Sequence, residues 1–408
     1  MIQVWTDGTE AGLLEREQER GSVFAYSPEA QAARAVSLTM PVQLASWKTP
    51  YGLPPVFEMN LPEGALRERL LLGFAKAAGR FDDIDLLAIT GRSQLGRIRY
   101  TGRGDTLDDE VPFQDVREIL ARGRDGNLFQ YLIDKFARYS GVSGVQPKFL
   151  VRDESALARA KSAGFRQSPN WRGATHIVKL WDAGEFPHLA ANEYFCLKAA
   201  GRCGLAVPRF QLADDGAALV IDRFDLQDGR AYQGFEDFCV LNANSTAEKY
   251  RGSYETALFK RFGQFASPRD SSDDLRRLFT LFVLNCALRN GDAHLKNFGV
   301  VYNAIGDDVR LAPVYDLVTT TVYIPGDTMA LTLNGTTRWP AAKDLIRFGE
   351  TRVSLTPAQA RQVLEQVADA LSLTARDLRR YRKQHPAFAP IGEAMLREWA
   401  AATALSLQ

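Results

Sequence analysis

Two short apolar runs enclose a polar turn in the second half of the chain. The first run, residues 278–288, has the pattern of a buried helix. The second, residues 298–302, is rich in β-branched residues and predicts a strand. Between the runs lie a carboxylate, an imidazole, an ammonium and a carboxamide, at Asp292, His294, Lys296 and Asn297. Loops held by buried elements commonly carry catalytic groups, so this turn is the first candidate site.

The same pattern predicts a mixed N-terminal part and a chain that becomes mostly helical toward its end. Alternation and apolar runs predict strands at residues 2–5, 22–26, 149–151, 175–180 and 218–221. Helical spacing predicts helices at residues 66–74, 110–138 and 190–202. Residues 91–100 predict either a pair of strands or a strand with a turn. Thr356 followed by Pro357 predicts a capped helix start.

Composition narrows the class of protein. The 408 residues allow two or three domains, and 46% hydrophobic with 24% charged residues is ordinary for a globular protein. A formal net charge of +1 gives no general attraction to nucleic acid or to an anionic membrane. We expect a cytoplasmic protein without a membrane segment, because no signal peptide and no apolar run of about 18 residues is found. The main basic cluster is expected to be the solvated face of a helix: Arg376, Arg379, Arg380, Arg382 and Lys383.

The cysteines give no sign of a disulfide framework or a zinc site. They are Cys196, Cys203, Cys239 and Cys286, without a CxxC pair or a histidine at zinc spacing. We therefore expect buried thiols in a reducing compartment.

The polar turn carries the groups that phosphoryl transfer needs. Asp292, Asn297 five residues later, and Asp316 beyond the strand follow the order of a protein-kinase catalytic loop. Asp292 would accept or orient the hydroxyl, and Asn297 and Asp316 offer oxygen ligands that suit Mg²⁺. Lys296 would neutralise charge on the transferred group, and His294 is expected to orient the loop rather than to act as a base. The alternative for the whole set is a polar turn that bonds only to itself.

A loop rich in serine and glycine precedes the strand at 149–151. Gly141 and Gly144, flanked by Ser140 and Ser143, could turn backbone N–H groups toward phosphate oxygens. The signal is weak when taken alone, because the loop matches neither a Walker A loop nor a dinucleotide fingerprint.

A lysine inside an apolar strand is a sharper signal. Lys179 needs a partner there, because an unpaired buried charge is costly, and an ATP phosphate together with Glu193 would supply one. The alternative is a strand-end lysine that points into water. Residues 222–225 follow a buried strand and could form a hinge that holds a purine edge, with Phe224 covering the ring. A simple turn at the strand exit is the alternative for this segment.

Taken together, these motifs resemble the HipA-like serine/threonine kinases of bacterial toxin–antitoxin pairs. The clearest marks are the segments 60–64, 143–148, 176–180, 192–194, 222–225, 236–239, 291–298 and 313–316. The resemblance implies an α+β, two-lobed, protein-kinase-like fold. Its parts would be an N-terminal coupling subdomain at 1–105, a kinase N-lobe at 106–225 that ends at the hinge, and a mostly helical C-lobe at 226–408.

The resemblance also implies roles for individual residues. ATP would be bound by Ser143, Gly144, Val145, Gln146, Lys148, Lys179, Glu193, Asp222, Arg223, Phe224 and Asp225. Asp292 would be the catalytic aspartate, acting with His294 and Lys296, and Asn297 and Asp316 would hold Mg²⁺. Many relatives phosphorylate a serine of the glycine-rich loop, but the usual position is Gly141 here. Autophosphorylation is therefore expected at Ser143 or Ser140, if it occurs.

For the whole protein, the resemblance implies a toxin that phosphorylates an aminoacyl-tRNA synthetase, with the glutamyl enzyme favoured, and so arrests growth. A helix-turn-helix antitoxin of the HipB type would restrain it, and DNA would be met only through that antitoxin. Two alternatives stay open. A lipid or small-molecule kinase is disfavoured because no membrane helix or strong basic patch is present. A catalytically silent co-repressor is disfavoured because Lys179, Asp292, Asn297 and Asp316 are all retained.

Overall fold

The computed structural model describes residues 1–17, 20–75, 81–107, 110–122, 127–142, 144, 146–153, 172–181, 184–227, 231–306 and 308–408. This part of the chain forms two compact units. The first comprises Met1–Leu180, Arg209–Thr246 and Val301–Asp308, and the second comprises Trp181–Pro208, Ala247–Val300 and Val309–Gln408. The domain boundaries predicted near residues 105 and 225 stay predictions.

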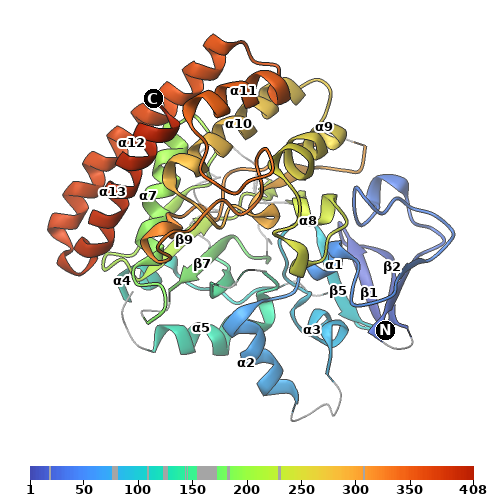
Figure 1. The fold of residues 1–408 in the computed structure, drawn as a ribbon. Coiled ribbons are helices and arrows are strands. Elements are labelled where there is room, and N and C mark those ends of the chain that lie inside the picture. The colour runs from blue at the N-terminus through green and yellow to red at the C-terminus, as the bar shows by residue number, and fades with distance from the viewer. Residues whose placement is uncertain are drawn as a thin grey trace, which may run out of the picture. The chain divides into compact units, whose positions relative to one another are not determined.

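An antiparallel sheet of five strands forms the N-terminal part of the first unit (Figure 1). The strands, in spatial order, are β4 (Trp47–Thr49), β3 (Ser22–Tyr26), β2 (Thr9–Arg16), β1 (Ile2–Thr6) and β5 (Ile98–Gly102). The strands predicted at 2–5 and 22–26 are confirmed, and residues 91–100 form a turn that leads into β5. Val4, Leu14, Phe24 and Tyr100 are fully buried and supply the core on one face of the sheet.

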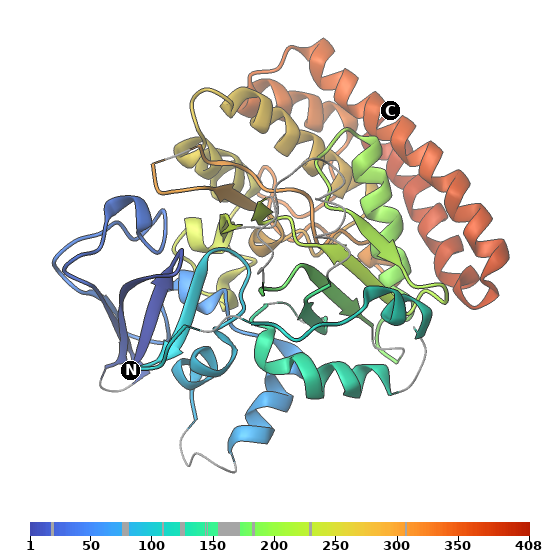
Figure 2. The ribbon, with the colours of Figure 1, turned by 180° about the vertical axis from the view of Figure 1, so that it is seen from behind.

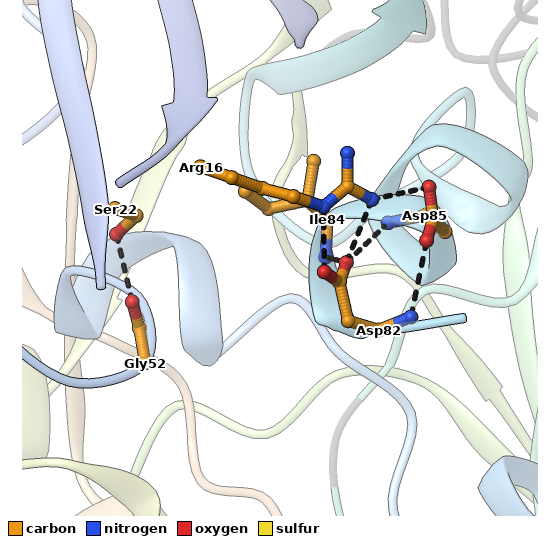
Figure 3. A network of polar contacts seen from close by, with 6 residues as sticks. All are labelled: Arg16, Ser22, Gly52, Asp82, Ile84 and Asp85. Atoms are coloured by element: carbon orange, nitrogen blue, oxygen red, sulfur yellow. Dashed lines mark hydrogen bonds and ion pairs between the residues drawn. The ribbon is translucent and has the colours of Figure 1, made fainter. Parts of the chain in front are cut away.

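Three helices follow or join this sheet: α1 (Pro55–Glu58), α2 (Gly64–Ala75) and α3 (Asp83–Thr90). Figure 3 shows how Arg16, at the end of β2, binds Asp82 and Asp85 at the start of α3, with Arg16 Nε 2.6 Å from Asp82 Oδ2. The Asp82 carboxylate accepts bonds from two helix N–H groups, and the Asp85 carboxylate accepts one from the Asp82 N–H, which makes a capping box. The Ser22 hydroxyl donates to the Gly52 carbonyl over 2.7 Å. The Arg16 bonds fix α3 to the sheet, and the Ser22 bond fixes the segment that contains Gly52.

A second antiparallel sheet, of four strands, also belongs to the first unit. In spatial order its strands are β6 (Lys148–Val151), β7 (His176–Leu180), β9 (Ala218–Asp222) and β8 (Phe210–Leu212). The pairing predicted for 149–151 and 175–180 is confirmed. The register sets Lys148 directly opposite Lys179, and the two residues are 6% and 3% exposed. The alternative of a strand-end lysine in water is therefore excluded for Lys179.

The rest of the first unit consists of short elements. They are α4 (Val116–Arg122), α5 (Leu128–Phe136), β10 (Leu226–Gln227), β11 (Ala231–Tyr232), β12 (Gly234–Asp237) and α8 (Phe238–Leu241). Helices α4 and α5 both lie within the helical region predicted at 110–138.

Glu236, in β12, is a fully buried carboxylate. It accepts hydrogen bonds from the Ser37 hydroxyl and the Leu38 N–H, both over 2.8 Å, and from the Tyr302 hydroxyl over 2.5 Å. Burial raises the pKa of Glu236 to about 7, although these donors and the nearby Arg97 act in the opposite direction. The folded chain therefore holds a proton at Glu236 more tightly than the unfolded chain does.

We expect the free energy of unfolding to fall by roughly 2–3 kcal/mol between pH 5 and pH 8 because of Glu236 alone. Its carboxyl titrates near 4.5 when unfolded and near 7 when folded. The stability it contributes is therefore complete below the lower pKa and lost as the pH rises through the higher one. Urea unfolding at both pH values checks this, with Glu236→Gln as the comparison. A pH dependence that is equal in the two proteins would contradict it.

The second unit is mostly helical. Its helices are α7 (Leu189–Arg202), α9 (Arg261–Phe265), α10 (Ser271–Leu288), α11 (Ala342–Val353), α12 (Pro357–Gln384) and α13 (Ala389–Ser406), with a π-helix at Tyr254–Lys260. The helices predicted at 190–202 and 278–288 are confirmed, as is the strand at 298–302, which is β13 (Gly299–Tyr302). Short β14 (Arg310–Leu311) follows. The described chain contains both antiparallel sheets and many helices, which confirms the α+β class.

Helix α12 begins as the sequence predicts, with a capping box between Thr356 and Gln359 and with Pro357 in the first turn. It lies beside α13 (Figures 1 and 2). The basic cluster lies on the solvent side of α12: Arg376, Arg379, Arg380 and Lys383 are exposed, and Arg382 pairs with Glu393 over 3.3 Å. The interpretation as a solvated helix face is confirmed.

Two further expectations concern the whole chain. All four cysteines are buried, and within the described residues none of them forms a disulfide. No helix in the described ranges combines the length and apolar character that crossing a membrane requires.

Candidate active site

Hydrogen bonds hold the turn after α10 from several directions. Arg289 ends the helix with a left-handed φ of 57°. The Asn290 side chain accepts a bond from the Asp292 N–H over 3.2 Å. The Gly291 N–H donates to the Thr320 hydroxyl over 2.7 Å. The turn is therefore held in one conformation, because hydrogen bonds bind it at and beside residue 291.

Gly291 has no room for a side chain. A Cβ there would lie 2.1 Å from the Asp327 carboxylate and 2.6 Å from the Thr328 carbonyl oxygen. The Asp327 carboxylate is itself held by the Thr320 hydroxyl. Glycine is needed at 291 because both a packed carboxylate and backbone approach the turn closely.

Asp292 combines a fixed backbone with an accessible carboxylate. Its side chain is 47% exposed. Its backbone carbonyl accepts a bond from the Asn297 amide over 2.6 Å. Its Oδ1 accepts a bond from the Tyr250 hydroxyl over 2.6 Å and lies 3.6 Å from His294 Nε2. This is the arrangement expected of a base that must meet an incoming hydroxyl.

A hydrogen bond links the segment that carries Asp316 to the turn that carries Asn297. The Tyr315 hydroxyl donates to the Lys296 carbonyl over 3.0 Å, which ties the residue before Asp316 to the residue before Asn297. Asp316 has a left-handed φ of 50°, a strained conformation that is common at functional sites. The Asn297 amide nitrogen is bound within the turn, so its carboxamide oxygen is the atom that could face a cation.

This donor set fits Mg²⁺ bound together with a nucleotide. Within the described ranges no three or more His, Cys, Asp or Glu residues gather as a metal cluster. Mg²⁺ commonly takes one or two protein oxygens and completes its shell with phosphates and water. One carboxylate and one carboxamide are therefore enough for a nucleotide-bound ion, although they would not make a metal site without phosphates.

His294 and Lys296 are buried, with 5% and 8% of each residue exposed. Burial, together with the positive charges of Lys249 and Lys296, lowers the pKa of His294 to about 3. A ring of such low basicity stays neutral at physiological pH. A neutral ring can hold the turn by packing and hydrogen bonding, which is what an orienting role requires.

Part of the glycine-rich loop can be described. Gly144 has a φ of 122°, and a Cβ there would lie 2.3 Å from Lys148 Nζ, so the Lys148 ammonium lies against the loop backbone. The Gln146 side chain donates to the Leu180 carbonyl over 2.9 Å and ties the loop to β7. Ser143 and Val145 lie outside the described residues.

The start of the loop is tightly packed. Ser140 is fully buried, and its hydroxyl donates to the Phe136 carbonyl over 2.8 Å and accepts from the Leu150 N–H over 3.0 Å. A Cβ on Gly141 would lie 2.0 Å from the Gln94 side chain. Phosphorylation of Ser140 would require both of its bonds to break. A serine could not replace Gly141 unless Gln94 moved.

Lys179 and Glu193 are both buried charges. Lys179, in β7, is 3% exposed, and Glu193, in α7, is 1% exposed. They belong to different units, and their pairing stays a prediction.

The segment predicted as a hinge contains a buried ion pair. Arg223 and Asp225 have fully buried side chains, and Arg223 Nε donates to Asp225 Oδ1 over 2.9 Å. Arg223 also donates to the Gln94 carbonyl over 2.7 Å, and Asp225 accepts from the Gly96 N–H over 2.6 Å. The side chains of Arg223 and Asp225 are already bound inside the unit. A purine would therefore have to bind the backbone groups of this segment.

The neighbouring hinge residues also have contacts of their own. Asp222 Oδ1 lies 3.2 Å from His176 Nε2, and the Phe224 ring meets Phe235 edge to face at 5.2 Å. Their predicted part in ATP binding stays a prediction.

Sequence reasoning missed Tyr250, which touches the candidate base. It lies 42 residues before Asp292 and belongs to no recognisable motif. The backbone carbonyl of the neighbouring residue, Lys249, accepts a hydrogen bond from the Leu295 N–H over 3.1 Å. Nothing in the local pattern could have indicated either contact.

Comparisons with known proteins agree with this geometry. Two family models match the chain, the HipA N-terminal domain over residues 2–101 and the HipA-like C-terminal domain over residues 140–374. The Sinorhizobium fredii protein Y4dM, named as a candidate kinase, is 30% identical over 369 residues, which cover 84% of this chain and 82% of the relative. Y4mE of the same organism, also named as a candidate kinase, is 26% identical over 356 residues, covering 79% and 78%.

A solved structure shows the same fold. HipA of the Shewanella oneidensis MR-1 toxin–antitoxin system, in complex with HipB and its operator DNA, matches with a TM-score of 0.71 at 18% identity. The match covers 99% of this chain and 97% of that one. The predicted HipA-type α+β fold is confirmed.

Proposed function

This chain belongs to the HipA family, and we propose that it is an ATP- and Mg²⁺-dependent serine/threonine protein kinase that acts as the toxin of a toxin–antitoxin pair. The observation that carries the proposal is the turn around Asp292. Its backbone is fixed by Gly291 and Asn297, while its carboxylate is nearly half exposed. A kinase needs a positioned base of this kind, because phosphoryl transfer depends mainly on placement and charge.

The sheet of the first unit supports binding of a polyphosphate. Lys148 and Lys179 are opposite one another on β6 and β7, so their side chains leave the same face of the sheet with Cβ atoms about 4.5–5.5 Å apart. The two lysines put two positive charges on one face of the sheet, which a bound triphosphate would contact. Gly144 lets the loop backbone approach the same place, because its Cβ position is taken by Lys148 Nζ.

In the proposed reaction the acceptor hydroxyl oxygen bonds to the γ-phosphorus, the bond to the ADP oxygen breaks, and Asp292 receives the hydroxyl proton. Lys296 supplies positive charge beside the turn, and neutral His294 keeps the turn in place. Asn297 and Asp316 would hold Mg²⁺. Bound there, the ion would supply charge neutralisation at the β- and γ-phosphates.

The substrate and partner follow from the family. We propose an aminoacyl-tRNA synthetase as the phosphorylated protein, with the glutamyl enzyme favoured, and a HipB-type helix-turn-helix antitoxin as the partner. The Shewanella HipA was solved with HipB and operator DNA, which supports an antitoxin partner for this chain.

The test is transfer from γ-labelled ATP. We expect the purified chain to label protein in a cell lysate with Mg²⁺ and to lose that activity in EDTA, because the proposed donor set needs the cation. Label in a lipid or small-molecule fraction instead of protein would favour a different kinase class. ATP binding with no turnover would favour a silent co-repressor and contradict the proposal.

A further inference from the structure

Tyr250 reaches the candidate base from a distant part of the chain. Its hydroxyl donates a hydrogen bond to Asp292 Oδ1 over 2.6 Å, although the two residues are 42 positions apart. Both residues lie in the second unit. This distance is the one at which a catalytic base holds the proton-bearing group that it serves.

The position of Tyr250 is set by the turn itself. Its ring meets the His294 ring edge to face, with 5.0 Å between centroids. Lys249 Nζ lies 5.3 Å from the centroid of the Tyr250 ring, and the Lys249 carbonyl accepts the Leu295 N–H. Residues 249–250 are thus fastened to the turn at two successive residues, 294 and 295. These contacts therefore fix the position of the Tyr250 ring, and with it the position of the hydroxyl beside Asp292, although the ring is exposed.

Other tyrosines of the same unit show what a purely structural role looks like. Tyr254 is 1% exposed and donates to the Ala293 carbonyl over 3.0 Å. Tyr323 donates to the Pro187 carbonyl over 3.0 Å. These hydroxyls satisfy backbone groups. Tyr250 is 49% exposed, so its ring contributes little to the core, and its hydroxyl is used on an exposed carboxylate.

We propose that Tyr250 is a positioning residue for phosphoryl transfer, which holds the Asp292 carboxylate through Oδ1 in the rotamer that receives the acceptor hydroxyl. The inference rests on the proposed kinase function. An aspartate side chain that is nearly half exposed would otherwise visit several rotamers, and only some of them point at the acceptor. A carboxylate held in one rotamer before the acceptor arrives spends no time in unproductive rotamers. Preorganisation of this kind raises a reaction rate.

The test is Tyr250→Phe, which keeps the ring on His294 and removes the hydroxyl. We expect kcat to fall about 10- to 100-fold, with KM for ATP within about twofold and an unchanged melting temperature. Tyr323→Phe is the matched control, because it removes a hydroxyl bound to a backbone carbonyl in the same unit. It should lower the melting temperature slightly and leave kcat unchanged.

The outcomes separate this inference from the proposed function. Wild-type kcat in Tyr250→Phe, with Asp292→Asn inactive, would overturn the positioning role and leave the kinase assignment intact. Full activity in Asp292→Asn would overturn the kinase site itself. If Tyr250→Phe lowered the melting temperature as well as kcat, the residue would be assigned to folding, and the inference would also be overturned.

Discussion

Asp292→Asn should lower the rate of phosphate transfer by a factor of about 10³ or more while the fold stays intact. The change removes both the proton acceptor and the negative charge. The carboxamide has nearly the same size, and the side chain it replaces is nearly half exposed, so packing is unaffected. The bond from the Asn297 amide goes to the backbone carbonyl of residue 292 and survives the substitution. Initial rates with γ-labelled ATP, together with thermal melts, measure the effect.

A suitable control is Asp115→Asn. Asp115 is an acidic residue of the first unit that pairs with the exposed side chain of Arg117. Its substitution should leave the rate unchanged. Undiminished transfer in both Asp292→Asn and Asp316→Asn would place the chemistry elsewhere in the chain.

Asp225→Ala should destabilise the protein by about 3–5 kcal/mol. Both side chains of the Arg223–Asp225 pair are fully buried, so the substitution leaves a guanidinium inside the unit without its counter-charge. It also removes the acceptor of the Gly96 N–H. Urea unfolding at constant pH measures the loss.

The comparison is Asp115→Ala, which breaks an ion pair to an arginine side chain that is 84% exposed and also removes the acceptor of the Arg117 N–H. Solvent screens a pair of this kind, so its loss should cost much less than the loss of the buried pair. If Asp225→Ala and Asp115→Ala lowered the free energy of unfolding by the same amount, the buried Arg223–Asp225 pair would not stabilise the fold in the way described above. Replacing both Arg223 and Asp225 with apolar residues should recover much of the loss, because no charge is then left buried.

The sequence was a good guide where local patterns decide the structure. Apolar runs predict α10 and β13, and Thr356 with Pro357 marks the start of α12, because periodicity and capping are properties of neighbouring residues. The candidate site around Asp292 is visible in the sequence for a similar reason, since its chemical groups fall within a few residues of one another. For Lys179 the sequence left two alternatives open, a partnered lysine in the strand and a lysine in water, and the structure shows the residue buried.

Contacts between distant residues could not be found in this way. The Arg223 bond to the Gln94 carbonyl and the Tyr250 bond to Asp292 join parts of the chain that only packing brings together. The close approach of Asp327 to Gly291 is of the same kind. Ser140 shows the limit at short range, because its hydroxyl turns inward to Phe136 and Leu150 and the residue type does not reveal that direction.

The contact between Gly141 and Gln94 restricts how this loop can evolve. Because the amide of Gln94 fills the space that a Cβ at 141 would need, a phosphorylatable serine cannot arise at 141 by a single substitution without a clash. Either the Gln94 side chain shifts and gives up its bond to the Thr90 carbonyl, or a smaller side chain at 94 makes the room. A smaller residue at 94 should therefore make a serine at 141 easier to accept, and regulation through residue 141 depends on what happens at position 94.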